Sequence, residues 1–106
     1  ICAAAAYFET LATPESLDFG WRYTRRFGLD APTLNSVGES CYEGILLLSS
    51  LAHRAGSLDV RRMTAAAESL SYAGPRGEVL MRQRHLDQRV YLAEAHDLQL
   101  DVVAQL

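Results

Sequence analysis

The sequence contains no lysine, and all ten of its basic residues are arginines. With thirteen acidic residues the formal net charge is −3, so arginine pairs such as Arg61 and Arg62 predict solvated helix faces rather than a nucleic-acid surface. Long apolar runs are also missing, because neither residues 1–8 nor the aliphatic run Ile45 to Leu48 approaches the length that a bilayer requires. We therefore expect neither direct nucleic-acid binding nor a membrane span.

Cysteine and histidine are scarce, and their spacing argues against chemistry. Cys2 and Cys41 form no C-x-x-C motif; we expect two small buried side chains, although one disulfide between them stays open. Cys41 and His53 lie on one predicted helix about 18 Å apart along its axis, too far for a catalytic dyad. The histidines His53, His85 and His96 fall on different predicted elements without ligand spacing. We expect no catalytic residue, no metal site and no cofactor, and hence no enzyme.

The composition is that of a globular domain. Of 106 residues, 49% are apolar and 22% are charged, which suits one compact unit. Residues 1–8 predict a short buried strand. Thr13 and Pro14 predict the start of a helix, and Gly28 predicts its end after Phe27. This helix is expected to carry two apolar rows, one containing Leu17 and Trp21 and the other containing Phe19.

The middle of the chain predicts two further helices. One spans about residues 38–55, is apolar on most sides, ends at Gly56 and is expected to be buried on more than one face. Ser57 or Asp59 then caps a third helix with an inward stripe. The stripe consists of Val60, Met63, Ala67 and Leu70.

The spacing of apolar residues changes from helical to alternating after a turn marked by Gly74, Pro75 and Gly77. Alternating residues predict three strands, at 78–83, 89–94 and 98–103, with the last tight connection at His96 and Asp97. A lone strand, three apolar helices and a short meander do not close a core. The pattern therefore predicts an α/β chain that is part of a larger protein.

Several segments, in this order, resemble one family. They are "YFETLATPESLDFGWRYTRRFG", "GESCYEGILLL", "RAGSLDVRRM", "GPRGEVLM" and "RHLDQRVYLAEAHDLQLDVV". Their order and spacing resemble the C-terminal portion of type 1 periplasmic binding proteins, the leucine/isoleucine/valine-binding class, and within it the branch that binds urea and short-chain amides. The resemblance implies a partial type 1 periplasmic-binding-protein fold, with residues 1–73 in the N-terminal lobe and residues 74–106 returning toward the other lobe.

The resemblance also implies a function. The protein is expected to bind a small polar solute, such as urea, a short-chain amide or an amino-acid-like molecule, as the extracytoplasmic receptor of an ABC permease. The alternative is a cytoplasmic amide sensor that regulates transcription through a partner protein. The isolated segment is expected to self-associate, because its helices present unpaired apolar faces.

Four residues are candidates for ligand contact. The resemblance implies that Glu39 and Tyr42 lie near the cleft between the lobes, where they could contact a ligand. The residues alone allow a structural role instead, in which Glu39 complements the positive end of the helix dipole and Tyr42 packs within the lobe. Ser36 and Val37, in the stretch 35–37, are expected either to form an apolar pocket wall at a strand end or to belong to a connecting loop.

Tyr7 and Phe8 are assigned to packing rather than to the rim of a pocket. The chain departs from the family pattern at Ser40-Cys41, at Arg84 and at Asp97-Leu98, which leaves the identity of the ligand open.

Overall fold

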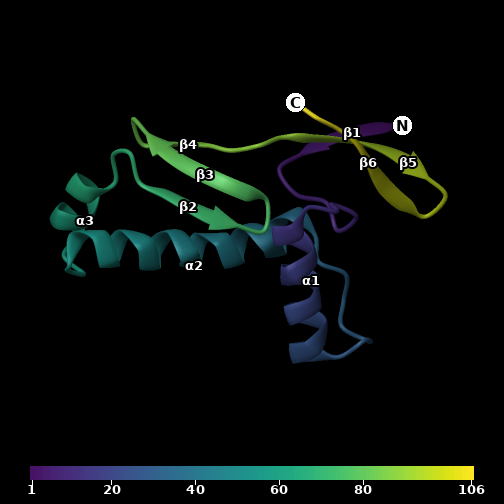
Figure 1. The fold of residues 1–106 in the computed structure, drawn as a ribbon, viewed down its shortest axis with the longest axis horizontal. Coiled ribbons are helices and arrows are strands. Elements are labelled where there is room, and N and C mark those ends of the chain that lie inside the picture. The colour runs from purple at the N-terminus through teal and green to yellow at the C-terminus, as the bar shows by residue number, and fades with distance from the viewer.

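The computed structural model describes residues 1–106 and has the predicted order of a strand, three helices and further strands. The strands form two separate antiparallel sheets of three strands each. One sheet has the order β1-β5-β6 and consists of Cys2–Ala5, Tyr91–His96 and Gln99–Gln105. The other has the order β2-β3-β4 and consists of Ser71–Gly74, Gly77–Arg82 and His85–Asp87. Figure 1 shows the sheet β2-β3-β4 lying along α2, whereas the sheet β1-β5-β6 lies beyond the N-terminal end of that helix.

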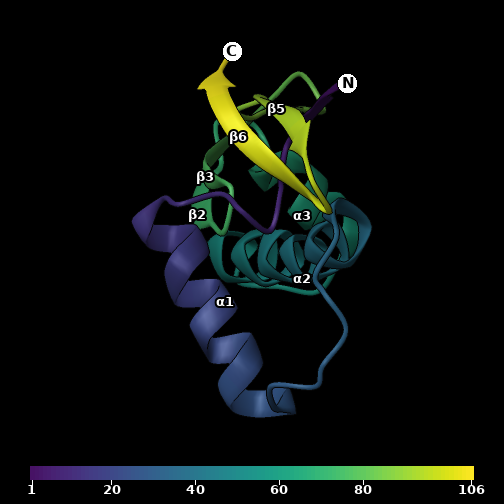
Figure 2. The same ribbon diagram turned by 90° about the vertical axis from the view of Figure 1, so that its right-hand side faces the viewer.

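Helix α1 spans Pro14–Phe27 and has the predicted ends. The Thr13 hydroxyl accepts the N–H of Ser16 at 3.3 Å, and Gly28 ends the helix with φ +91°, a conformation that favours glycine. Neither apolar row is buried along its length: Phe19 is buried, whereas Trp21 is 60% exposed and Phe27, at the end of the other row, is 63% exposed. Figure 2 shows why: α1 descends away from both sheets, so its outer side meets no other element.

Helix α2 spans Ser36–Ala55 and starts two residues earlier than predicted. The Asn35 side chain accepts the N–H of Gly38 at 2.9 Å, which makes Asn35 the N-cap. The expectation of a strand end at residues 35–37 is therefore wrong, because Ser36 and Val37 open the helix.

The expectation that α2 is buried on more than one face is also wrong. Its fully buried residues are Glu39 and Glu43, whereas Ile45 is 66% exposed and Leu48 is 51% exposed. Figure 1 shows the sheet β2-β3-β4 along a single side of the helix, so the opposite side is left without a partner.

Helix α3 spans Val60–Ala66, shorter than predicted, and is capped by Asp59, whose carboxylate accepts the N–H of Arg62. Met63 and Leu70 are buried as predicted, but Val60 is exposed. The helix stops because the chain joins the sheet: Leu70 and Ser69 exchange backbone hydrogen bonds with Met81.

Strands β3, β5 and β6 occupy the three predicted segments, with ends displaced by up to two residues, whereas β2 and β4 were not predicted. Both are very short and flank tight turns. Gln83 and Arg84 in the β3–β4 turn both have positive φ, the conformation of a type I′ hairpin turn. The last turn lies at Asp97 and Leu98, one residue later than expected, with Asp97 at φ +54°.

The main apolar core lies where the sheet β1-β5-β6 meets α1 and the start of α2. Its members are Tyr7, Phe8, Leu11, Phe19, Tyr91 and Ala93. Tyr7 and Phe8 therefore pack as predicted, but both also line an open groove, which the prediction had not included. The expectation that the cysteines are buried is wrong, because Cys2 and Cys41 are exposed free thiols. Cys2 alternates outward on the half-exposed strand β1, and Cys41 lies on the side of α2 opposite the buried glutamates.

Candidate functional site

A buried charged cluster joins α2 to the turn between β2 and β3. Glu39 is fully inaccessible to solvent and Glu43, one helical turn later, is nearly so. Arg76 in the turn lies between them: its Nη2 is 2.5 Å from Oε2 of Glu39, and its Nε is 3.1 Å from Oε2 of Glu43. One guanidinium thus serves two buried carboxylates.

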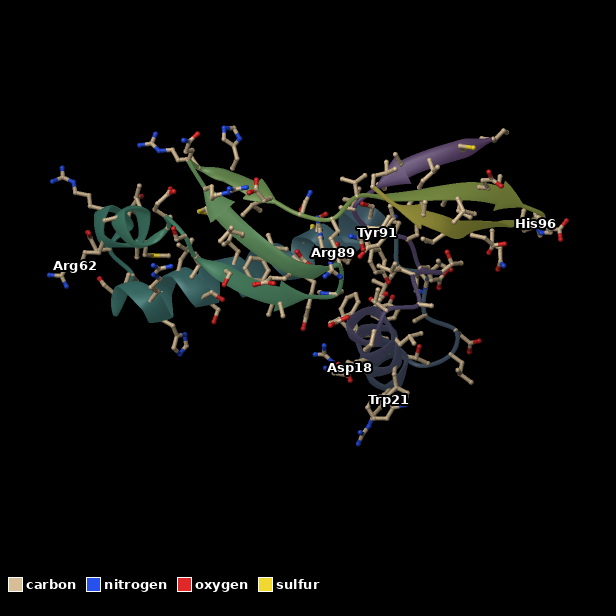
Figure 3. All side chains as sticks on the ribbon, turned by 45° about the horizontal axis from the view of Figure 1, so that its top comes forward. Asp18, Trp21, Arg62, Arg89, Tyr91 and His96 are labelled. Carbon is tan, nitrogen blue, oxygen red and sulfur yellow. The ribbon has the colours of Figure 1, made fainter.

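The other polar groups of Arg76 connect the cluster to further elements. Nη2 donates to the Ser40 hydroxyl at 2.9 Å, Nη1 donates to the Gln88 side chain at 2.7 Å, and the backbone carbonyl accepts the Tyr91 hydroxyl at 3.0 Å. Gln88 precedes β5 in the connection that links the two sheets. Figure 3 shows Tyr91 and Arg89 in the central region where that connection passes from one sheet to the other. The cluster therefore fixes α2, the β2–β3 turn and the connection between the sheets in one arrangement.

Burial governs the protonation of the cluster. It raises the pKa of Glu39 to about 7; the neighbouring Glu43 adds to this effect, and the ion pair with Arg76 opposes it. The Tyr72 hydroxyl donates to Glu43 at 3.2 Å, and burial together with that carboxylate raises the pKa of Tyr72 to about 12. Glu39 therefore exchanges a proton near neutral pH, while Tyr72 stays protonated and donates.

The cluster is closed to solutes. Every buried side-chain nitrogen and oxygen has a hydrogen-bond partner, so no polar group is left free for a ligand. No group of three or more potential metal ligands occurs in the chain, and none of its helices is long and apolar enough to cross a bilayer. The arrangement is suited to holding elements together.

An open groove of about 600 Å³ lies at the N-terminal end of α2. Its walls come from residues 7–10, residues 33–36, and residues 97–100 at the β5–β6 turn and the start of β6, together with Ala5 and Ala95. Tyr7, Phe8 and Leu34 supply apolar surface, Asn35 and Ser36 supply neutral polar groups, and the wall also contains the carboxylates of Glu9 and Asp97. Apolar walls with a few polar groups are typical of sites for small solutes.

The four predicted contact residues do not share one pocket. Ser36 lines the groove, Val37 follows it on the exposed start of α2, and Glu39 lies in the closed cluster. Tyr42 faces a different pocket, against α1, where its ring lies 4.7 Å from that of Phe19. Direct ligand contact by these residues stays a prediction.

The roles of Arg76 and Glu43 in the buried cluster were not predicted from the sequence. The spacing of four between Glu39 and Glu43 placed both carboxylates on one helix face, and this was the available signal. Nothing in the local sequence indicated that Arg76, far along the chain, would lie between them.

Comparison with known proteins places this geometry in context. The family described as periplasmic binding protein matches residues 1–99. Among solved structures, a solute-binding protein of an ABC transporter from Rhodopseudomonas palustris BisB5, in complex with 3,4-dihydroxybenzoic acid, has 21% identity and a TM-score of 0.84. A leucine-binding protein from Thermotoga maritima has 16% identity and a TM-score of 0.82, and an ABC transporter substrate-binding protein from Sphaerobacter thermophilus has 16% identity and a TM-score of 0.85.

Each of these three comparisons covers 100% of this chain and 30% of the other. The chain therefore spans less than a third of the length of these proteins. No curated protein matches the sequence.

The likeness to these structures confirms the expected fold: three helices and two small antiparallel sheets correspond to part of a type 1 periplasmic binding protein. The compared proteins are described as solute-binding or substrate-binding proteins of ABC transporters. On the match over residues 1–99, the chain belongs to the periplasmic binding protein family.

Proposed function

We propose that the chain is part of a non-enzymatic solute-binding protein that serves as the substrate-binding component of an ABC transporter. The observation that carries the proposal is the family match over nearly the whole chain. In such a receptor two lobes close over the solute, and the ligand's contacts to both lobes shift the population toward the closed form. A permease then recognises that form.

The exposed apolar surface supports a place within a longer bilobed protein. Ile45 and Leu48 on α2, and Leu17 and Trp21 on α1, are large apolar side chains that are at least half exposed. Large apolar side chains that cluster on an exposed helix surface often mark a place where another part of a protein packs. We place the chain in the C-terminal portion, with residues 1–73 in one lobe and residues 74–106 returning toward the other.

The groove at the start of α2 is the proposed place of solute contact. The first N–H groups of a helix lack intrahelical partners, and the positive end of the helix dipole favours a negatively polarised atom. Ser36 and Val37 provide the first two of these N–H groups, beside the groove wall formed by Tyr7 and Phe8. A carbonyl or carboxylate oxygen of a small polar solute suits this position.

The proposed solute class follows from that oxygen. Urea, short-chain amides and amino-acid-like molecules all present one, and the urea and amide branch is the one that the sequence resembles. In this proposal Glu39 and Tyr42 act by packing, because Glu39 is paired with Arg76 and Tyr42 accepts a hydrogen bond from Arg22 at 3.2 Å.

Calorimetry of the full-length protein tests the proposal. Urea, acetamide, leucine and 4-hydroxybenzoate are titrated separately, and we expect saturable binding of one class without any product. A Ser36→Trp variant should fill the groove and abolish binding while the melting temperature stays the same. Ser49→Trp, on an exposed position of the same helix, is the matched control and should bind normally. Turnover of a titrated solute, or equal binding by both variants, would contradict the proposal.

The alternative is a cytoplasmic amide sensor with a regulatory partner protein, and it rests on the sequence resemblance to a branch that includes such sensors. Cell fractionation separates the two roles. A cytoplasmic protein that co-purifies with a transcriptional regulator in an amide-dependent manner would favour the sensor.

A further inference from the structure

Four arginines and two apolar side chains lie together at one end of the molecule. We call this set the arginine tip; it consists of Arg54, Leu58, Val60, Arg61, Arg62 and Arg84, all exposed. The C-terminal end of α2, the link to α3, α3 itself and the β3–β4 turn meet there (Figure 1). Figure 3 shows Arg62 at this extreme of the molecule, with His96 at the opposite extreme.

Hydrogen bonds join the parts of the tip. The N–H of Gln83, in the β3–β4 turn, donates to the Glu68 carboxylate at 3.0 Å. Ser69 and Met81 are linked through their backbones at 2.9 Å, which ties the segment after α3 to the strand that precedes the turn. The β3–β4 turn and α3 are therefore held at the same end.

The positive charge of the tip is only partly compensated by the carboxylates near it. Arg54, Arg61, Arg62 and Arg84 take part in no ion pair. The acidic groups nearby are already engaged, because Asp59 caps α3 and Asp87 pairs with Arg82.

The charge is also distributed unevenly over the chain. Residues 53–68 and 82–87 contain five arginines and three carboxylates, whereas all other residues contain five arginines and ten carboxylates. The molecule is thus electrically polarised, with its positive pole at the tip.

Apolar side chains protrude between these arginines. Leu58 is 82% exposed and Val60 is 75% exposed. Val60 lies immediately before Arg61 and Arg62, and Asp59, which caps α3, separates it from Leu58. Exposed aliphatic groups flanked by arginine are the combination that binds an anionic bilayer surface, because the aliphatic groups enter the interface while the cations meet lipid phosphates.

We propose that the arginine tip binds the surface of an anionic lipid bilayer and thereby orients the protein on it. Coverage by another part of the same polypeptide would require that part to bring carboxylates to four guanidinium groups, because burying them unpaired is strongly unfavourable. A protein partner fits less well, because a stable interface uses roughly 20–30 residues on each side, whereas the tip is a small set of side chains at the end of the 48 Å long axis. A bilayer needs no such shape complementarity.

Flotation of the full-length protein with lipid vesicles tests the proposal. One vesicle is phosphatidylcholine alone, and the other contains phosphatidylcholine and phosphatidylglycerol in equal parts. We expect binding to the second vesicle and a loss of that binding at high salt. The double substitution of Arg61→Gln and Arg62→Gln should lower the partition coefficient by about thirtyfold, which corresponds to about 1 kcal/mol for each arginine near the surface.

The matched control is the double substitution of Arg25→Gln and Arg26→Gln, on the exposed part of α1 outside the tip. It removes the same charge, and it should leave vesicle binding nearly unchanged. Leu58→Asp should weaken vesicle binding and leave the melting temperature unchanged, because the side chain is exposed.

Three results would overturn the proposal: equal partition onto both vesicles, equal losses in both arginine pairs, or no vesicle binding at all. Retention on immobilised polyglutamate without vesicle binding would indicate an acidic protein partner instead, and would overturn the lipid assignment.

Discussion

Substitution of Arg76 by methionine should be among the most destabilising single changes in this chain. Methionine retains much of the volume of arginine but removes the cation that Glu39 and Glu43 share. It also removes the donors to Ser40 and Gln88. Two buried carboxylates are then left without a counterion.

The expected loss is large in relation to the stability of a domain. Removing one partner of a buried ion pair costs about 3–5 kcal/mol, and a natural domain is stable by only about 5–15 kcal/mol. By comparison, Arg82→Met removes an exposed ion pair with Asp87 and should cost less than about 1 kcal/mol. Arg82 is therefore the matched control.

The loss should depend on pH in a defined direction. With Arg76 present the pKa of Glu39 is already raised from 4.5 to about 7, and without the cation it rises further. Above the unfolded pKa the unfolded chain ionises while the folded carboxyl stays protonated, so stability falls as pH rises through this range. The Arg76→Met variant should therefore be least stable under alkaline conditions and should partly recover near pH 4.5.

Thermal unfolding followed by far-ultraviolet circular dichroism measures this difference at an acidic and an alkaline pH. If Arg76→Met does not fold at alkaline pH, the acidic measurement and the Arg82→Met control still give the comparison. Equal, small losses for both arginine variants at both pH values would refute the reasoning, since the buried cluster would then contribute no more than a surface pair.

Two further predictions concern the same region. Glu39→Gln imitates the protonated side chain, so the variant should be as stable as the wild type near pH 4.5. Above about pH 7 it should be more stable, because the wild type must then ionise a buried carboxyl. Melting temperatures at the two pH values measure this difference, and a variant that is less stable at both would contradict the raised pKa of Glu39. Gly74→Ala should cost roughly 2 kcal/mol or more in chemical denaturation, because a Cβ at position 74 would lie 2.2 Å from Oε1 of Glu43 and would displace a buried charge. Gly20→Ala is the control, because no atom lies within 4 Å of its added Cβ. In a helix this change should stabilise the folded protein by up to about 1 kcal/mol. A similar loss of stability at both positions would count against the steric explanation.

The sequence predicted those features that depend on neighbouring residues. The start and end of α1 were correct because Thr13, Pro14 and Gly28 act on the backbone beside them. The end of α2 at Gly56, which adopts the left-handed conformation, was correct for the same reason. The start of α2 was missed by two residues because the capping side chain of Asn35 was assigned to a loop.

Predictions about which face is buried were less successful. A row of apolar residues on a helix indicates that some surface will cover it, but not whether that surface lies within the same chain. Leu17, Trp21, Ile45 and Leu48 were expected to be covered and are exposed here. The short strands β2 and β4 were missed because their pairing with β3, rather than their own composition, makes them strands.

The sequence by itself determined the order of one strand, three helices and further strands, both ends of α1, the end of α2, the family resemblance and the scarcity of catalytic groups, because each depends on local chemistry or on the order of motifs. Only the tertiary structure decided that Glu39 is a buried partner of Arg76, that Ser36 and Tyr42 face different pockets, and that the arginine tip gathers at one end. Each of these features joins residues far apart in the chain. Such pairs are chosen by the packing of whole elements, which no local pattern specifies.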